Sequence, residues 1–538
     1  MNFNYDDRDN LEEMIDSTGT TTNTYDVAGR LTSHTDSNGH TVGYAYDAAG
    51  NLTELTYPPN ARKVKYTYDN LNRLSTVTID WVVGRPSMQY IYDDANRLDR
   101  IEHFNAMETD YTWDNANRLT GIAHEGPSDL VAYNFLLNPN GNRVQETISP
   151  DPVISGSLIT DDTSFAYNLQ RNRLNAKSKH TYTYDQGQLT GTVDTVESLF
   201  TYDLEGQLQN KGGVNYTFDD AHRLVQRAGK SFSYDGVGNR VRAVRNGTVT
   251  QYVYDAAGNL LAEANSSGTI TRYYIYGAGL AAMVMASNNY FVYHFDGTGH
   301  TIALTNPSNN VVNKYAYSPY GRLLGQVQGI SQPFKYAGQV GIFAESDTLL
   351  YMRARYYDVE VGRFISEDPA GFIDGTNLYA YVGGNPVNAV DPTGQFLMFV
   401  PGIVGGVANV AVTAAFGDTD VASLGTAFLA GALGAYVPGG AAALAVKQSA
   451  KIGLKLSGGA VAGAGANAAG QVVNNLQAGR SAGEIDYTQV GVAAVGGFLG
   501  TASTLGAGTR AVETVTAGIF GTKFGLASGA ANKIISGK

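Results

Sequence analysis

Large apolar side chains recur at every second position along much of the first half of the chain. Residues 42–46, for example, read Val-Gly-Tyr-Ala-Tyr, so that a branched or aromatic side chain alternates with a small residue. A period of two is typical of a β-strand with one buried face and one face toward solvent. The pattern therefore predicts a strand at residues 42–46 and, by repetition, a mainly β structure for this region.

The residues that flank this strand carry turn signals. Upstream, the pair Asn38-Gly39 is favoured in two-residue hairpin turns, and we expect such a turn there. Downstream, Asp47 is expected to head a turn by accepting bonds from backbone N–H groups, and Gly50 to adopt a positive φ. Leu52 would then begin the next strand, so that one unit of the pattern is about one β-hairpin.

The unit recurs as the motif aromatic-Asp-x-x-(Gly/Asn/His)-x-Leu. Clear copies begin at Tyr25, Tyr46, Tyr68, Tyr92, Trp113, Tyr202, Phe218 and Tyr254, and looser copies begin at Leu137, Tyr167, Tyr184 and Tyr234. A single hairpin cannot bury its aromatic face, so repeats of this kind must stack into a long sheet. We expect the tyrosines to be architectural; the alternative is a surface on which sugars stack.

The composition changes at about residue 395. The chain has 538 residues, no Cys and a formal charge of −12. These values exclude disulfide frameworks, Cys-ligated metal sites and thiol nucleophiles, and they argue against general nucleic-acid binding. All eight His precede residue 396, and residues 396–538 contain only eight basic and five acidic residues. Two zones this different are expected to be separate physical units.

The repeats of residues 20–260 resemble the YD repeat of the Rhs and teneurin-like families, in which repeats wind a sheet into a hollow shell. Residues 351–395 read YMRARYYDVEVGRFISEDPAGFIDGTNLYAYVGGNPVNAVDPTGQ and are similar to the Rhs-associated core domain almost throughout. The resemblance implies a β-shell fragment at 1–290, a core block at 291–395 that closes one end of the shell, and an α-helical Gly/Ala-rich region at 396–538. Full shells in this family are longer, which implies a missing N-terminal part.

In that family the core block is an aspartyl autoprotease that cuts just after the final Asp-Pro-x-Gly-(Leu/Met) motif and frees a C-terminal toxin. By resemblance, the catalytic residues are Arg355, Asp368 and Asp391. Two adjacent carboxylates cannot both ionise cheaply, so one can keep a proton and polarise a carbonyl while the other activates water. The arginine can orient one of them. The alternative is that both Asp-Pro pairs are ordinary turn starters.

One position departs from the family motif. Gln395 follows Gly394 where the family usually has Leu or Met, and Phe396 comes next. Cleavage is therefore expected to be slowed, shifted to near the Gln395–Phe396 bond, or absent. Three nearby carboxylates are weaker candidates for the site: Asp358, Glu367 and Asp374.

The last region has four uncharged stretches, each long enough to span a bilayer as a helix: residues 396–417, 421–446, 456–479 and 487–509. Gly residues four apart, such as Gly402 and Gly406, would allow close helix contacts. The region lacks the His and Cys that zinc deaminases and His-dependent nucleases require. Three interpretations stay open: a membrane-inserting, pore-like effector, an inert helical segment that precedes a toxin, and an unrecognised soluble toxin.

The resemblance implies the C-terminal part of a polymorphic toxin of bacterial competition, in which a β-shell encapsulates and releases an effector. It implies as partners a secretion-system spike or the missing shell region, and an immunity protein. It also implies that the tail, residues 396–538, inserts into a membrane, and that the protein uses no metal or organic cofactor. The first residues, MNFNYDDRDNLEE, contain no readable Sec-type signal peptide. Secretion or surface display would then use a specialised system. The alternatives are a surface adhesion protein whose repeats bind carbohydrate and a degenerate, inactive paralogue.

Overall fold

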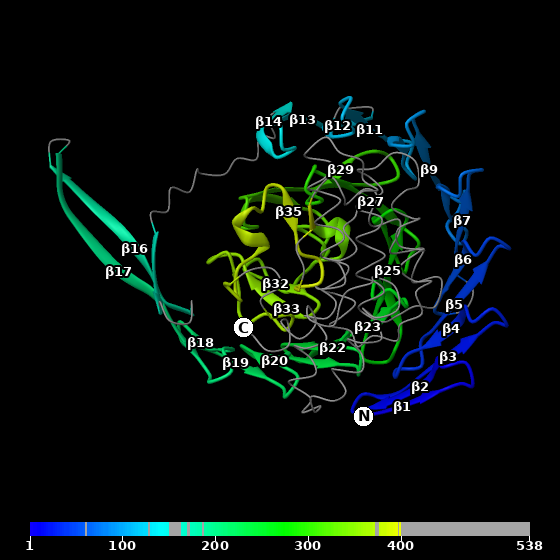
Figure 1. Cartoon of the computed structure of the whole chain (residues 1–538), viewed down its shortest axis with the longest axis horizontal. Coiled ribbons are helices and arrows are strands. Elements are labelled where there is room, and N and C mark those ends of the chain that lie inside the picture. Colours follow the sequence, from blue (N-terminus) through cyan, green and yellow to red (C-terminus); the bar gives the residue numbers. More distant parts are fainter. Residues whose placement is uncertain are drawn as a thin grey trace, which may run out of the picture. The chain divides into compact units, whose positions relative to one another are not determined.

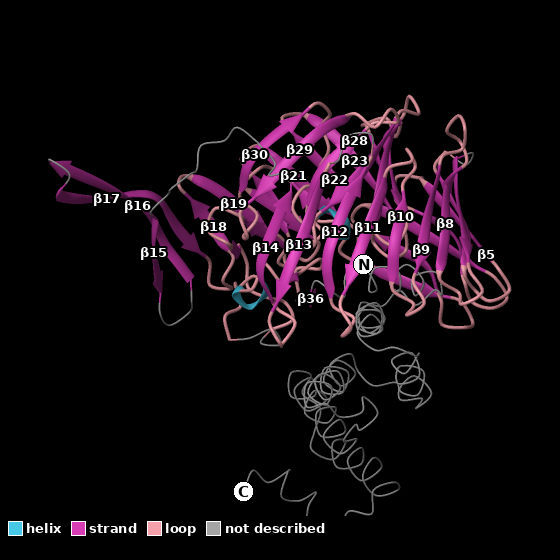
Figure 2. Ribbon diagram, turned by 90° about the horizontal axis from the view of Figure 1, so that it is seen from above, coloured by secondary structure: helices cyan, strands magenta, loops and turns pink. Residues whose placement is uncertain are grey.

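The computed structural model describes residues 1–59, 62–126, 130–149, 163–168, 173–185, 188–371, 376–395 and 398–399, all of which lie in the first of two units of the chain, Met1–Thr419. Of residues 396–538, where helices were expected, the structure describes only Met398 and Phe399, which form a short strand and not a helix; the rest of the region lies outside the described residues. The described part is almost entirely β, as predicted (Figure 2), and its helices are two single 3₁₀ turns, η1 (Gly338–Val340) and η2 (Val382–Gly384). Neither helix of this part has the length and hydropathy that crossing a membrane requires.

Two long antiparallel sheets contain most of the strands, and each strand pairs with its neighbours in sequence (Figure 1). The first sheet has 14 strands: β1 (Asn2–Tyr5), β2 (Leu11–Asp16), β3 (Gly19–Tyr25), β4 (Leu31–Thr35), β5 (Thr41–Tyr46), β6 (Leu52–Tyr57), β7 (Arg62–Tyr68), β8 (Leu74–Ile79), β9 (Ser87–Tyr92), β10 (Leu98–Glu102), β11 (Glu108–Trp113), β12 (Leu119–Glu125), β13 (Val131–Leu137) and β14 (Arg143–Ser149).

The second sheet has 16 strands: β15 (Thr163–Asn168), β16 (Arg173–Asp185), β17 (Gln188–Tyr202), β18 (Leu208–Lys211), β19 (Val214–Phe218), β20 (Leu224–Arg227), β21 (Lys230–Tyr234), β22 (Arg240–Arg245), β23 (Thr248–Tyr254), β24 (Leu260–Ala264), β25 (Ile270–Tyr276), β26 (Leu280–Met285), β27 (Tyr290–Phe295), β28 (Thr301–Thr305), β29 (Val311–Tyr317) and β30 (Leu323–Gln328). One repeat is therefore about one hairpin, as the sequence pattern predicts.

The repeated Asp heads a turn of fixed geometry. The amide of Asn51 donates to Asp47 Oδ1 at 2.9 Å, and the amide of Gly50 donates to the Asp47 carbonyl at 3.1 Å. Gly50 has φ 93°, a conformation that Gly adopts freely and that Asn tolerates. Positive φ values occur at the same motif position in other copies, at Gly29, Asn72, Asn96, Asn117, Gly206 and His222. This backbone requirement explains why the motif has Gly, Asn or His there.

The turn before β5 corrects one prediction. Asn38-Gly39 does not form a two-residue hairpin turn, because β4 ends at Thr35 and β5 begins at Thr41. Instead, Asp36 heads the connection, with its Oδ1 accepting from the amide of Asn38 at 2.8 Å and that of His40 at 2.9 Å. The longer, Asp-headed turn is favoured because the Asp36 carboxylate accepts hydrogen bonds from both of these backbone amides.

Consecutive turns are linked by an Arg and an aromatic residue. Arg97 Nε lies 2.6 Å from Asp93 Oδ2 in its own turn, while its Nη1 donates to the Asp114 carbonyl of the next turn at 3.1 Å. The Tyr92 hydroxyl donates to the Leu74 carbonyl of the preceding unit at 2.9 Å. This repeat is thus fixed to both neighbours, which is the nearest-neighbour stabilisation expected of a repeat array.

Apolar side chains of the two long sheets pack in one cluster, which includes Val64 and Val77 of the first sheet and Val284 of the second. Hydrogen bonds also join the sheets: the hydroxyl of Tyr57 on β6 donates to the carbonyl of Tyr274 on β25 at 2.9 Å. Tyr57 is fully buried. Its position in the core agrees with an architectural role and is incompatible with a sugar-stacking surface at this residue.

The core block adds short strands to this framework. Four of them form a small antiparallel sheet, β31 (Phe343–Ala344), β32 (Leu349–Met352), β33 (Arg355–Asp358) and β34 (Arg363–Phe364), and two form a separate pair, β35 (Ala389–Val390) and β36 (Met398–Phe399). Some of their buried side chains, such as Leu350 and Val390, belong to a second apolar cluster, in which the rings of Tyr357 and Tyr381 have a centroid distance of 4.5 Å. This small sheet carries the candidate site.

Candidate active site

The structure brings together the three residues that the sequence predicts as catalytic. Arg355 is the first residue of β33. Its Nη2 lies 2.8 Å from Asp368 Oδ2 and 3.5 Å from Asp391 Oδ2. The three side chains expose 2%, 5% and 2% of their surface, respectively. Residues that are 13 and 36 positions from Arg355 in sequence therefore share one guanidinium nitrogen in a site closed to bulk water.

The two Asp-Pro pairs form turns like those of the repeats. Asp368 Oδ1 accepts from the amide of Ala370 at 2.8 Å, and Asp391 Oδ1 accepts from the amide of Gln395 at 3.1 Å. Gly371 and Gly394, each three residues after its Asp, have φ 73° and 71°. The turn interpretation and the catalytic interpretation are thus compatible, because Oδ1 of each carboxylate caps its turn while Oδ2 faces Arg355.

The same residues hold the peptide group between Gly394 and Gln395. Arg355 Nε donates to the Gly394 carbonyl, and Asp391 Oδ1 accepts from the Gln395 amide. Gly394 is needed for this close approach, because a Cβ at this position would lie 2.4 Å from the Met352 carbonyl oxygen. The structure therefore places Gly394 and Gln395 of the predicted cleavage region at the site, whereas Phe396 lies outside the described residues.

Two further contacts of Arg355 are with an aromatic ring and with a backbone carbonyl. Its guanidinium carbon lies 3.6 Å from the centroid of the Phe364 ring, and Nη1 donates to the Leu378 carbonyl at 3.0 Å. Sequence reasoning missed both residues, since neither an apolar ring nor a backbone carbonyl has a sequence signal. An enclosed, weakly polar setting strengthens the electrostatic effect of the guanidinium on nearby carboxylates.

The weaker candidates have other partners. Lys211 Nζ lies 2.5 Å from Asp358 Oδ2, and Arg173 Nη2 lies 3.1 Å from Glu367 Oε1. Burial raises the pKa of Asp358, and Lys211 opposes that effect. Asp374 lies outside the described residues. Among the described residues, no group of three His, Asp or Glu side chains could hold a metal ion.

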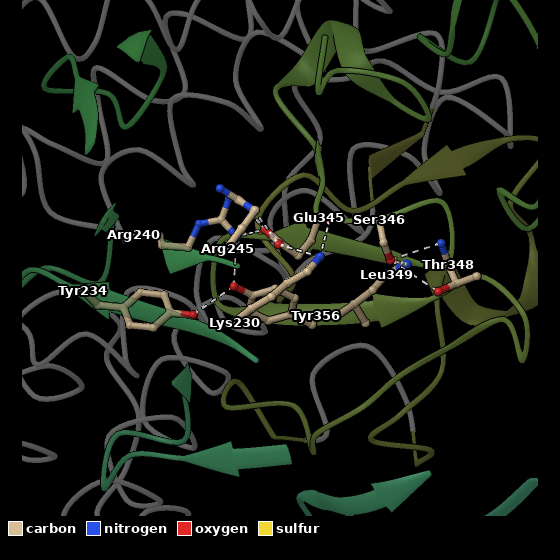
Figure 3. A network of polar contacts seen from close by, with 9 residues as sticks. All are labelled: Lys230, Tyr234, Arg240, Arg245, Glu345, Ser346, Thr348, Leu349 and Tyr356. Atoms are coloured by element: carbon tan, nitrogen blue, oxygen red, sulfur yellow. Dashed lines mark hydrogen bonds and ion pairs between the residues drawn. The ribbon is translucent and has the colours of Figure 1, made fainter. Parts of the chain in front are cut away.

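Figure 3 shows a second buried charge cluster, which contacts Tyr356, the residue after Arg355 on β33. The Glu345 carboxylate is fully buried and accepts from Arg240 Nη1 at 2.9 Å, from Arg245 Nε at 2.7 Å and from Lys230 Nζ at 3.3 Å. These cations hold the pKa of Glu345 below its ordinary value although burial acts to raise it. Sequence analysis did not find this cluster, because its members lie about 100 residues apart and form no local motif.

Two family models match the chain. The RHS repeat model matches residues 5–41, 25–58 and 46–80, and the teneurin YD-shell model matches residues 153–387. The chain is a member of the Rhs/YD-repeat family. This confirms the resemblance that the repeats and the core block show. Asp391 lies just beyond the matched shell segment, so its assignment rests on the site geometry and on the motif.

Named relatives support the same family. The tRNA nuclease WapA of Bacillus subtilis (strain 168) is 33% identical over 229 residues, which are 40% of this chain and 10% of that protein. Double-stranded DNA deaminase toxin A of Burkholderia cenocepacia (strain H111) is 29% identical over 376 residues, 65% of this chain and 22% of that protein. This chain therefore spans only a minor part of either Rhs/YD-repeat relative.

A solved structure supports the fold. The crystal structure of TcdB2-TccC3-Cdc42 matches with a TM-score of 0.55 at 18% identity, over 75% of this chain and 24% of that chain. At this identity the likeness concerns the fold alone.

Proposed function

We propose that this Rhs/YD-repeat chain is the C-terminal part of a toxin-delivery protein that cuts itself near residue 395 and thereby frees residues 396–538 as an effector. The single observation that carries this proposal is the shared contact of Arg355 Nη2 with Asp368 and Asp391, at 2.8 and 3.5 Å. Two carboxylates around one buried cation, beside an immobilised peptide, are the groups that acid–base hydrolysis of an amide requires.

The roles of the side chains follow from their contacts. Arg355 and Asp391 fix the Gly394–Gln395 peptide group, and we assign the cut to the next bond in sequence, Gln395–Phe396. Where two carboxylates share a site, one generally keeps a proton. The ionised one takes a proton from water, whose oxygen adds to the Gln395 carbonyl carbon. The protonated one polarises that carbonyl, and the breaking C–N bond leaves its electrons and a proton on the Phe396 nitrogen.

The proposal also includes the partners of the protein and the target of the released residues. A toxin delivered to another cell would use a secretion-system spike or a further shell region, would be neutralised in the producing cell by an immunity protein, and would act after the tail is released. Insertion of the tail into a target membrane is the activity we propose for residues 396–538, because they contain four uncharged stretches of 22 to 26 residues.

The experiment uses the whole chain with a tag at each end, followed on a denaturing gel and by intact mass. The wild type should appear as pieces of 395 and 143 residues, whereas Asp368→Asn and Asp391→Asn should stay whole. Asp347→Asn is the matched control, since Asp347 is an exposed carboxylate of the same block. A mass of the large piece that is lower by one Gln residue would move the cut to Gly394–Gln395. A wild-type chain that stays whole would refute the proposal.

A further inference from the structure

Each of the three site residues lies within three positions of a residue that forms a hydrogen bond with a strand of the two long sheets. Tyr356 follows Arg355 on β33, and successive side chains of a strand point to opposite faces. The Tyr356 hydroxyl lies 3.0 Å from Arg240 Nη1 on β22 and 3.0 Å from the Tyr234 hydroxyl on β21 (Figure 3). Glu345 holds the same Arg240 at 2.9 Å. The strand that carries Arg355 is therefore held, through Tyr356 on its opposite face, by the repeat strands β21 and β22.

Glu367 precedes Asp368 and has a second, separate anchor. Arg173 Nη2 on β16 lies 3.1 Å from Glu367 Oε1, and Arg173 Nε donates to the Tyr379 hydroxyl at 3.2 Å. That hydroxyl is 2.7 Å from the carbonyl of Gly206, in the turn that follows β17. The turn that presents Asp368 is thus held by a different part of the second sheet from the part that holds Arg355.

The third anchor comes from the first sheet. Asn388 lies three residues before Asp391, and its Oδ1 accepts from the amide of Arg143 at 2.7 Å. Arg143 begins β14, and its guanidinium also donates to the Val387 carbonyl and to Thr298 Oγ1, the latter at 2.6 Å. The segment that presents Asp391 is therefore positioned by the last strand of the other long sheet.

We propose that these anchors make self-cleavage conditional on assembly: the repeat strands position the site, and Tyr356, Glu367 and Asn388 are its positioning residues. This inference rests on the proposed self-cleavage. The three site residues lie on segments separated by loops, and a site of this kind requires alignment to within about half an ångström. Anchors from β14, β16 and β21–β22 supply that alignment only when both sheets have docked on the core block. The tail would then be released only inside a shell that has already formed around the core.

The first test measures the rate of self-cleavage in whole-chain variants, each beside a control that loses the same group elsewhere. Tyr356→Phe is compared with Tyr92→Phe, since the Tyr92 hydroxyl makes a single repeat contact at 2.9 Å. Glu367→Gln is compared with Glu54→Gln, since Glu54 pairs with Lys63 at 2.6 Å within the first sheet. We expect the first member of each pair to slow cleavage at least about tenfold relative to its control.

Two further measurements distinguish a positioning role of these residues from a role in the stability of the fold alone. The thermal midpoints of each pair should differ little, and the double variant Arg173→Gln/Glu367→Gln should be no slower than the slower of the two single variants, because both lose the contact between Arg173 and Glu367. Rates within about twofold of the controls, or rate losses that simply follow the thermal midpoints, would overturn the inference.

Hydrogen exchange gives an answer that does not depend on cleavage. Asp391 Oδ1 accepts from the amides of Thr393 and Gln395 at 3.2 and 3.1 Å. Asn388→Ala removes the acceptor of the Arg143 amide and should raise exchange across residues 391–395 at least about tenfold, while Asn51→Ala, which removes a repeat contact at 2.9 Å, should not. Unchanged exchange in Asn388→Ala overturns the anchoring. A wild type that stays whole, together with raised exchange, supports the anchoring and refutes self-cleavage.

Discussion

Acidification should loosen the contact between the two long sheets through three buried histidines. His103 follows β10, His124 lies on β12 and His294 lies on β27 of the second sheet; the ring centroid of His294 is 5.1 Å from that of His103 and 5.4 Å from that of His124. The Phe295 carbonyl can only accept, so His124 Nε2, at 2.8 Å, must donate to it. His124 Nδ1 then accepts from Thr109 Oγ1 at 2.8 Å.

This chain of bonds fixes the neutral forms. Thr109 Oγ1 in turn accepts from His103 Nε2 at 2.7 Å, which leaves His103 Nδ1 buried without a hydrogen-bond partner among the described residues. A proton added there would be an unpaired buried charge. Burial, with His124 nearby, lowers the pKa of His103 to about 3, and burial lowers the pKa of His124 to about 4 although Asp296 opposes the shift. The pKa of His294 is also lowered, by burial and by the other two rings.

The sign and size of the effect follow from linkage. A histidine with a lowered folded pKa contributes full stability above the unfolded pKa of about 6.5 and loses it as the pH falls toward the folded value. At about pH 5, His103 and His124 should each cost about 2 kcal/mol, so the pair costs about 4 kcal/mol. Asp235 changes the stability in the opposite direction on acidification, because burial raises its pKa to about 6 and its protonation then favours the folded state. The difference between variants, rather than the total slope, is therefore diagnostic.

The assay is urea unfolding of the whole chain at about pH 7.5 and about pH 5, for the wild type and for His103→Gln/His124→Gln. The double variant should lose about 4 kcal/mol less than the wild type between the two pH values. His222→Gln is the control, since that side chain is half exposed. Equal losses in the wild type and the double variant would refute the assignment of the acid response to these histidines.

Three further substitutions test other parts of the structure. Gly394→Ala should abolish self-cleavage, whereas Gly39→Ala, with φ 83° and no atom near the added Cβ, should leave it intact; time courses on gels compare them, and a cleaving Gly394→Ala would contradict the close approach to Met352. Asp93→Ala should cost about 2 kcal/mol in urea unfolding, because two amides and Arg97 lose their acceptor; a loss under about 0.5 kcal/mol would count against the turn. Glu345→Gln should cost about 3 kcal/mol by leaving Arg240 buried without its carboxylate, and a cost equal to that of Glu54→Gln would show that the cluster is not needed.

The sequence by itself determined the local structure of the repeats. The alternation at residues 42–46 predicts β5, and the Asp and Gly of the motif predict the turn, because a carboxylate beside free amides and a residue with positive φ are local requirements. The length of the turn before β5 was predicted wrongly, since Asn38-Gly39 signals a tight hairpin only when no upstream carboxylate captures the amides. The family resemblance of the core block predicted Arg355 and both Asp residues as one group, and their catalytic role stays a prediction.

Only the tertiary structure decided how these residues meet. The contacts of Arg355 with Asp368 and Asp391, and the anchors from Arg143, Arg173 and Arg240, join positions that are 13 to 245 residues apart. No local pattern encodes them, because a long-range ion pair needs complementary charges at two sites but no fixed spacing between them. The local sequence determines which turns the chain can form. The packing of both sheets against the core block determines which side chains these turns bring together.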